Sequence, residues 1–177
     1  WHVQGYARSE ATRQEALARG LVDVCHDSIA ATVADADLIL IAVPMGQFAT
    51  VFEAVANARR ADSVVTDAGS TKGSVLIDIE ASLDAIPEWF VPGHPIAGSE
   101  RSGVESADPA LYVNHQVILT PTESTDAQAV ALVTAFWQEL GALVSHMDAS
   151  RHDEVLALTS HLPHVLAFNL VHALSDD

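Results

Sequence analysis

The sequence predicts an α/β fold, built on a mostly parallel sheet with helices on both faces and followed by a helical segment. Short apolar runs alternate with longer amphipathic ones over residues 1–147, which is the pattern of βαβ units. Proline and glycine stand where the apolar runs end. From residue 148 onward no strand pattern occurs, so we expect a domain boundary there.

The first elements carry clear local signals. A strand is expected in HVQGY (2–6), and a helix over SEATRQEALARG (9–20), with Ser9 as its N-cap and Gly20 as its stop. The run DLILIAVP (37–44) is continuously apolar and ends at proline, which predicts a strand buried on both faces.

The same alternation continues to residue 147. We expect helices and strands in the order helix 46–58, strand 63–70, helix 71–83, strand 88–95, strand 114–121, helix 126–141 and strand 142–147. Residues 148–177 predict one long helix, or two helices that meet near Pro163, because proline cannot donate a hydrogen bond within a helix. This segment is apolar almost all round, so it should be buried against something outside it.

Composition limits the classes of partner and compartment. A net charge of −16 argues against a nucleic acid partner. The single cysteine, Cys25, excludes an intramolecular disulfide and fits a reducing compartment such as the cytoplasm. Neither a signal peptide nor a membrane span is expected, and a chain that opens on Trp1 and a strand suggests a fragment or a processed protein.

Chemistry-bearing residues follow three consecutive strands. In open α/β sheets ligands bind outside the carboxyl ends of the strands. There the chain offers small residues, hydroxyls, one lysine and one histidine: Val43, Pro44, Asp67, Ala68, Gly69, Ser70, Lys72, His94, Ser99, Glu100 and Arg101. This collection predicts a crevice for a nucleotide and a substrate.

The end of the first strand bears on the cofactor. Dinucleotide-binding folds place there an acid for a ribose 2′-hydroxyl, or an arginine near a 2′-phosphate. Here Ala7 stands where the acid is expected, and Arg8 and Ser9 follow. The pattern leans towards NADP⁺, although Arg8 is equally well read as a solvent-exposed residue at a helix start. The GxGxxG loop of such folds would precede the first residue.

His94 is the candidate general base. It lies on a loop at a strand end, pinned by Pro95, and a neutral imidazole readily takes a proton near neutral pH. The alternative is a loop histidine that only hydrogen-bonds the backbone. Ser70, across the crevice, could orient His94 or hold the amide of the cofactor.

A second histidine cluster lies in the helical segment. His161 and His164 stand three residues apart, and His152-Asp153 precede them. A metal site is the weaker reading, because the HExxH spacing is absent and Pro163 interrupts the helix. We therefore predict no metal, and expect these imidazoles to face the crevice and hydrogen-bond an anionic or carbonyl-bearing substrate.

Four motifs carry a family resemblance. DAGSTKGSV (67–75), GHPIAGSERSGVESADPALY (93–112), VILTPTESTD (117–126) and HDEVLALTSHLPHVLAF (152–168) resemble, in this order and spacing, the prephenate dehydrogenases, including cyclohexadienyl and arogenate dehydrogenases. The resemblance implies a Rossmann-like dinucleotide-binding domain (1–147) and the beginning of an all-helical substrate and dimerisation domain (148–177). It also implies a cytoplasmic homodimer in tyrosine biosynthesis that uses NAD⁺ or NADP⁺.

The resemblance also assigns the reaction and its residues. It implies oxidative decarboxylation of prephenate to 4-hydroxyphenylpyruvate, with His94 as the base that accepts the proton of the C4 hydroxyl while hydride leaves that carbon. Ser70 matches a serine that hydrogen-bonds this histidine beside the nicotinamide. His161, His164 and Ser99 match substrate-facing residues. Ala7, Arg8, Ser9, Val43, Pro44, Ser70 and Lys72 then line the cofactor side.

Two departures from the family pattern affect the expected activity. The family's first strand with its glycine loop, and an arginine for the ring carboxylate, have no counterpart in these residues. Only Lys72, Arg101 and Arg151 could supplement the imidazoles. We therefore expect residues 1–177 alone to be inactive.

Other readings remain open on the sequence. A reductase of the β-hydroxyacid type would need a catalytic lysine in its helical domain, and no lysine follows Lys72. A non-catalytic nucleotide-binding remnant, a metal-dependent hydrolase and an arogenate dehydrogenase are the further alternatives.

Overall fold

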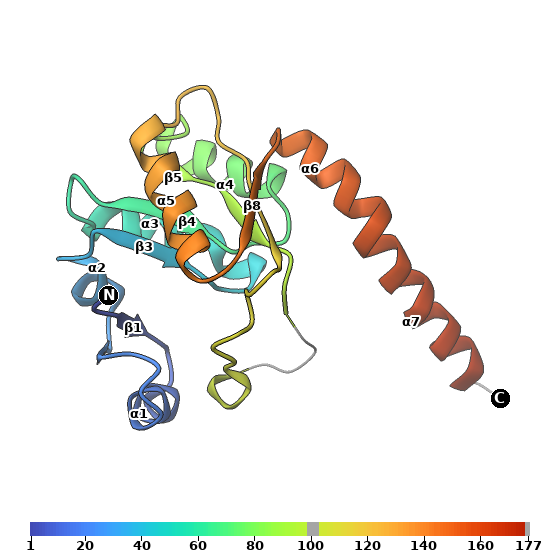
Figure 1. Cartoon of the computed structure of the whole chain (residues 1–177), viewed down its shortest axis with the longest axis horizontal. Coiled ribbons are helices and arrows are strands. Elements are labelled where there is room, and N and C mark those ends of the chain that lie inside the picture. The colour runs from blue at the N-terminus through green and yellow to red at the C-terminus, as the bar shows by residue number, and fades with distance from the viewer. Residues whose placement is uncertain (99–102, 176–177) are drawn as a thin grey trace.

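The structure is a computed structural model that describes residues 1–98 and 103–175, with a three-stranded parallel sheet at its centre (Figure 1). The strand order is β3-β4-β5, formed by Leu38–Ile41, Val64–Asp67 and Phe90–Val91. Ile41 pairs with Asp67 and Thr66 with Val91, so all three strands end at one edge. The predicted α/β class is confirmed.

Two further sheets contain the remaining strands. β1 (Gln4–Tyr6) and β2 (Val24–His26) form a parallel pair. The third sheet has the order β6-β7-β8, formed by Gly93–Pro95, Gln116–Leu119 and Leu143–His146. Within it β6 runs antiparallel to β7, whereas β8 runs parallel to β7.

Helices connect these strands, and their caps follow the local sequence. Their bounds are α1 Glu10–Ala18, α2 Ile29–Val33, η1 Met45–Gln47, α3 Phe48–Ala58, α4 Gly73–Leu83, η2 Val104–Ser106 and α5 Ala127–Glu139. Ser9 caps α1 as predicted, because its side chain accepts a hydrogen bond from the Thr12 amide. Gly20 follows the end of α1 with a φ of 67°, a left-handed conformation that glycine adopts without strain.

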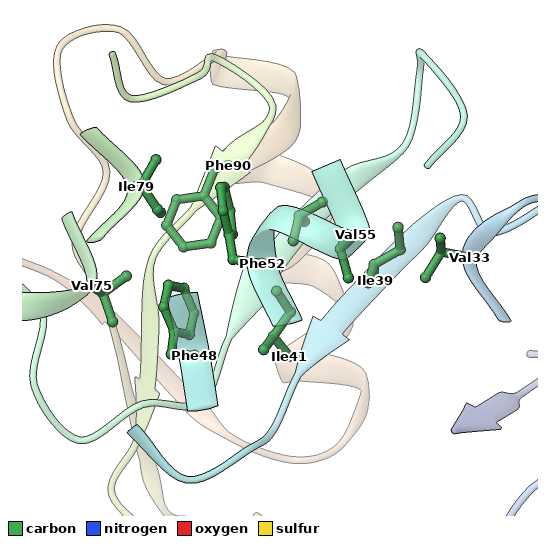
Figure 2. Close-up of a cluster of buried hydrophobic side chains, with 10 residues drawn as sticks. Val33, Ile39, Ile41, Phe48, Phe52, Val55, Val75, Ile79 and Phe90 are labelled. Atoms are coloured by element: carbon green, nitrogen blue, oxygen red, sulfur yellow. The ribbon is translucent and has the colours of Figure 1, made fainter. Parts of the chain in front are cut away.

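Two cores sandwich the central sheet. The first, shown in Figure 2, lies between β3, β4 and β5 and the helices α2, α3 and α4. Phe52 is fully buried in it, with ring centroids 5.3 Å from Phe90 and 5.6 Å from Phe48. The second core packs α5, through Val133 and Trp137, against strands β5 and β7.

β3 shows why its whole run is apolar. Ile39 and Ile41 belong to the first core, whereas Leu38 and Leu40 pack against the second. Side chains alternate between the two faces of a strand, so a strand between two helical layers needs apolar residues at every position. Both faces of the strand are therefore packed, but only the face of Ile39 and Ile41 is fully buried, and Leu38 and Leu40 are partly buried.

The predicted strand 88–95 is two strands in the structure. Pro92 separates them and has no amide hydrogen to donate to a ladder. Before it, Phe90 and Val91 pair with β4; after it, Gly93–Pro95 pair with β7. The carbonyl of Pro92 instead accepts a hydrogen bond of 2.9 Å from the Thr120 amide. The chain thus changes sheets immediately before His94.

Two short elements were not predicted from the sequence. β2 has three residues and α2 has five, too few to display a period of either kind. α2 does carry a local signal, since the Ser28 side chain accepts a hydrogen bond from the Ala31 amide.

The helical segment is one continuous helix that contains a single π-helical turn. α6 (Ala149–Leu156) leads into the π-helical turn η3 (Ala157–His161), and α7 (Leu162–Ser175) follows. The π turn ends two residues before Pro163, as expected where the missing amide and the bulk of a proline ring disturb the regular hydrogen-bond pattern of the helix. The helix projects from the α/β body (Figure 1), and its apolar residues Phe168 and Leu174 are 74% and 77% exposed.

This helix also bears on the membrane expectation. Ala149–Leu174 has 26 residues and a mean hydropathy of 1.2 over its most apolar window, so by length and composition alone it could cross a membrane. A single such helix is weak evidence, because a helix that packs inside a soluble helical domain has the same composition.

Replacing Phe52 tests the first core. Phe52→Ala should lower the free energy of unfolding by about 3–5 kcal/mol, because it removes a fully buried ring from between two layers. Ile77→Ala, on the exposed side of α4, is the control and should change it by less than about 0.5 kcal/mol. Urea-induced unfolding measures both. Equal effects of the two substitutions would contradict this packing.

Candidate active site

The carboxyl ends of the parallel strands bring three loops to one edge. The Ala68 amide donates a hydrogen bond of 3.0 Å to the carbonyl of Ile41, which joins the loops after β3 and β4. Pro44 and Ser70 are exposed on these loops, and His94 follows the end of β5 on β6. A separate hollow of about 470 Å³, lined by Ser63, Glu88 and Asp126 among others, lies where β4 begins, away from these strand ends.

A buried ion pair supports this edge. The Asp67 carboxylate and the Lys72 ammonium are both fully buried and lie 2.5 Å apart. Asp67 also accepts hydrogen bonds from the backbone amides of Gly69 and Gly93. Lys72 donates a second hydrogen bond, of 2.6 Å, to the carbonyl of Gly93. The pair therefore fixes the β4–α4 loop to the backbone on which His94 stands.

The burial of this pair has opposite effects on its two members. Loss of hydration raises the pKa of Asp67 and lowers the pKa of Lys72, because each charged form is disfavoured away from water. Their mutual attraction and hydrogen bond oppose both shifts.

His94 is hydrogen-bonded to a second imidazole. Its Nδ1 lies 2.8 Å from Nε2 of His152, which is fully buried on α6. Nδ1 of His152 lies 2.7 Å from Oδ1 of Asp153. A chain of hydrogen-bonded side chains therefore leads from His94, on the α/β body, to a carboxylate on the helical segment.

Asp153 connects this chain to the start of α4. Its two carboxylate oxygens accept hydrogen bonds from the backbone amides of Lys72 and Gly73, each 2.8 Å long. α4 has no capping side chain of its own at Lys72, so Asp153 supplies the cap from α6. Partial burial alone would raise the pKa of Asp153, but the donors Lys72, Gly73 and His152 together hold this pKa below its ordinary value.

The structure changes the expectation for Lys72. We expected this lysine to contact a cofactor, but its ammonium is fully buried and held by Asp67 and Gly93. A fully enclosed ammonium cannot contact a cofactor at an open edge. Its position shows that it holds the loop together.

Ser70 also differs from what the resemblance implies. Its side chain is exposed, and among the described residues it makes no hydrogen bond to His94. The Nδ1 side of His94 is occupied by His152 instead.

The remaining predicted residues are divided between described and undescribed parts. Ala7, Arg8 and Ser9 follow β1, where Arg8 is exposed and Ser9 caps α1. Val43 packs against the first core. Ser99 and Arg101 lie outside the described residues; the backbone of His161 is in η3 and that of His164 in α7, and their side chains are not described. Among the described side chains, which do not include those of His161 and His164, no three metal-ligating groups lie together.

Sequence reasoning missed three participants. The sequence groups His152 and Asp153 with the substrate-facing histidines, whereas in the structure they contact His94 and the start of α4. Asp67 was seen only as a strand-end residue. One signal was available for it, since the chain's single lysine lies five residues after an acid at the end of an apolar strand.

Removing one member of the buried pair tests its structural role. Lys72→Met should lower the free energy of unfolding by about 3–5 kcal/mol, because it leaves the Asp67 carboxyl buried without its cation. Adding Asp67→Asn should recover part of this loss. Arg19→Met, in an exposed pair with Glu15, is the control and should leave the urea midpoint unchanged. A Lys72→Met protein as stable as its parent would contradict the assignment.

Relatives with solved structures share this architecture. Prephenate dehydrogenase from Aquifex aeolicus superposes with a TM-score of 0.89 at 38% identity, over 98% of this chain and 62% of that one. The same enzyme in complex with hydroxyphenyl propionate and NAD⁺ also gives 0.89. Synechocystis arogenate dehydrogenase gives 0.84 at 27% identity, over 98% of this chain and 61% of that one.

Curated relatives agree with these structures. Cyclohexadienyl dehydrogenase of Zymomonas mobilis is 42% identical over 98% of this chain and 58% of its own length. Prephenate dehydrogenase of Bacillus subtilis is 37% identical over 96% of this chain and 46% of its own length. The chain therefore spans about half the length of the curated relatives it matches.

Family models match both parts of the chain. Residues 1–146 match the model described as the nucleotide-binding domain of prephenate dehydrogenase, and residues 148–177 match that of its dimerization domain. The chain belongs to the prephenate dehydrogenase family.

Proposed function

We propose that the protein containing this chain catalyses the NAD(P)⁺-dependent oxidative decarboxylation of prephenate to 4-hydroxyphenylpyruvate. The observation that carries the proposal is His94, a half-buried imidazole at the carboxyl edge of the sheet whose Nδ1 is held by His152. Family membership and the NAD⁺ complex of the Aquifex aeolicus relative support it.

The reaction needs a base beside a hydride acceptor. His94 takes the proton of the C4 hydroxyl, and the electron pair of that O–H bond forms the new carbonyl as hydride leaves C4. A nicotinamide, when bound at the strand ends, would supply the hydride acceptor. Loss of CO₂ then makes the ring aromatic, so the protein needs to position the substrate more than to drive this last step.

The strand ends fit a dinucleotide. Pro44 and Ser70 are exposed on adjacent loops, and Gly69 allows a tight β4–α4 loop: a Cβ there would lie 2.7 Å from both Asp67 Oδ2 and Met45 Sδ. Arg8 is exposed after β1, within the region that would meet the adenosine ribose. The complex of the relative supports NAD⁺, whereas Arg8 without an acid at position 7 favours NADP⁺.

The helical segment supports the assembly and substrate part of the proposal. We place His161 and His164 on the substrate side, since they follow His152 on the same continuous helix. The match to a dimerization domain and the exposed apolar residues of α7 support a homodimer, which we propose to be cytoplasmic. Arogenate is the second candidate substrate, favoured by the likeness to the Synechocystis enzyme.

His94→Asn tests the base. In the full-length enzyme, kcat for prephenate-dependent reduction of NAD⁺ or NADP⁺ should fall by about 10²–10⁴, because asparagine cannot accept the proton. His115→Asn, at an exposed histidine, is the matched control and should keep the parent rate. Undiminished turnover in His94→Asn would remove His94 from the base role. Turnover of arogenate alone would favour the second substrate.

Arg8→Ala tests the cofactor assignment. If Arg8 binds a 2′-phosphate, KM for NADP⁺ should rise by roughly tenfold or more, while KM for NAD⁺ stays unchanged. Arg19→Ala, at the other end of α1, controls for the general loss of a positive charge. An equal rise in KM for NAD⁺ and NADP⁺ would show that Arg8 does not distinguish the 2′-phosphate from the 2′-hydroxyl.

A further inference from the structure

We propose that His152 and Asp153 are positioning residues that hold His94 in the tautomer whose Nε2 accepts the proton from the substrate. The inference rests on the proposed function for the identity of the reaction. It assigns a role to two residues of the helical segment that the strand-end argument does not include.

The geometry is a continuous relay of three side chains. His94 Nδ1 and His152 Nε2 are 2.8 Å apart, and His152 Nδ1 and Asp153 Oδ1 are 2.7 Å apart. The His152 ring is fully buried, so water does not compete for either of its nitrogens. The His94 and His152 rings meet edge to face, with centroids 5.0 Å apart.

The direction of each hydrogen bond follows from Asp153. Its carboxylate accepts the amides of Lys72 and Gly73, and hydrogen bonds of this kind stabilise the ionised form. An ionised carboxylate can only accept, so Nδ1 of His152 must donate to it. In a neutral His152 the other nitrogen, Nε2, is then an acceptor, and Nδ1 of His94 donates to it.

The consequence for His94 is a defined tautomer. With its proton on Nδ1, the lone pair of its neutral ring lies on Nε2, the nitrogen directed away from His152. Uptake of the substrate proton at Nε2 makes His94 an imidazolium, which the Asp153 carboxylate stabilises through the His152 ring. The arrangement has the logic of a catalytic triad, with an imidazole inserted between the base and the carboxylate.

The relay also joins the two parts of the chain. His152 and Asp153 come from α6, whereas His94 comes from β6 and the capped amides from the start of α4. The orientation of the base therefore depends on the docking of α6 against α4. A purely structural role for His152 would explain its burial but would leave the protonation state of His94 unaffected.

The imidazole tautomers can be observed directly. Full-length enzyme labelled with ¹⁵N-histidine should show His94 protonated at Nδ1 and His152 also protonated at Nδ1. In Asp153→Ala, Nδ1 of His152 loses the acceptor that fixes its proton there, so part of the His94 population should carry its proton on Nε2. In the triad a fully wrong tautomer costs about 10⁴ in kcat, and for the mixed tautomers expected here we predict a loss of about tenfold to 10², with KM little changed.

A conservative series separates positioning from packing. His152→Gln keeps a carbonyl acceptor for His94 Nδ1 and should retain much more activity than His152→Phe, which fills the same space without an acceptor. His115→Gln is the matched control and should change neither spectra nor rate. Unfolding midpoints, measured for every variant, identify any loss that comes from instability.

Each outcome decides one of the two proposals. An unchanged His94 tautomer in Asp153→Ala, or equal activity in His152→Gln and His152→Phe, would overturn the positioning role. If the parent enzyme oxidises neither prephenate nor arogenate, the proposed function fails, and the imidazole spectra alone then decide whether the relay sets the His94 tautomer.

Discussion

The Asp67 carboxylate, buried at the end of β4, is the constraint on which the functional edge depends. It accepts hydrogen bonds from the Gly69 and Gly93 amides and from the Lys72 ammonium, so one side chain holds the loop after β4 and the strand that bears His94. A buried charge is tolerated only when its partners surround it. The geometry of the edge is therefore specified by this cluster, because any alternative placement of the loop would leave a charge or an amide buried without a partner.

The change of sheets at Pro92 places His94 next to the Asp67 cluster. Without an amide hydrogen at Pro92, the chain leaves the ladder with β4 and pairs with β7, and the Gly93 amide turns to Asp67. His94 then stands on a short strand supported from both sides, and a base held in this way loses little freedom when substrate binds. From the other side, α6 supplies His152 and Asp153, so the environment of the base combines residues of both matched domains.

Much of the fold could be predicted because local rules and the tertiary structure agree. β3 is apolar at every position because it lies between two cores, and α1 begins at Ser9 because its hydroxyl accepts the Thr12 amide. The elements that were not predicted, β2 and α2, are three and five residues long. They are too short to show a repeating pattern of apolar residues, and they form because of their strand pairing and packing. The resemblance to the prephenate dehydrogenases was readable from four motifs and is confirmed by the family models.

The sequence by itself determined the α/β class, the order of the longer elements and His94 as a strand-end imidazole, because periodicity, caps and prolines act over a few residues. Only the tertiary structure decided which groups meet. It buried Lys72 against Asp67, left Ser70 without a bond to His94 among the described residues, and brought His152 and Asp153 from α6 to the base. Contacts between residues 58 or 81 positions apart leave no local pattern, since they arise only when separate elements pack and their polar groups must find partners.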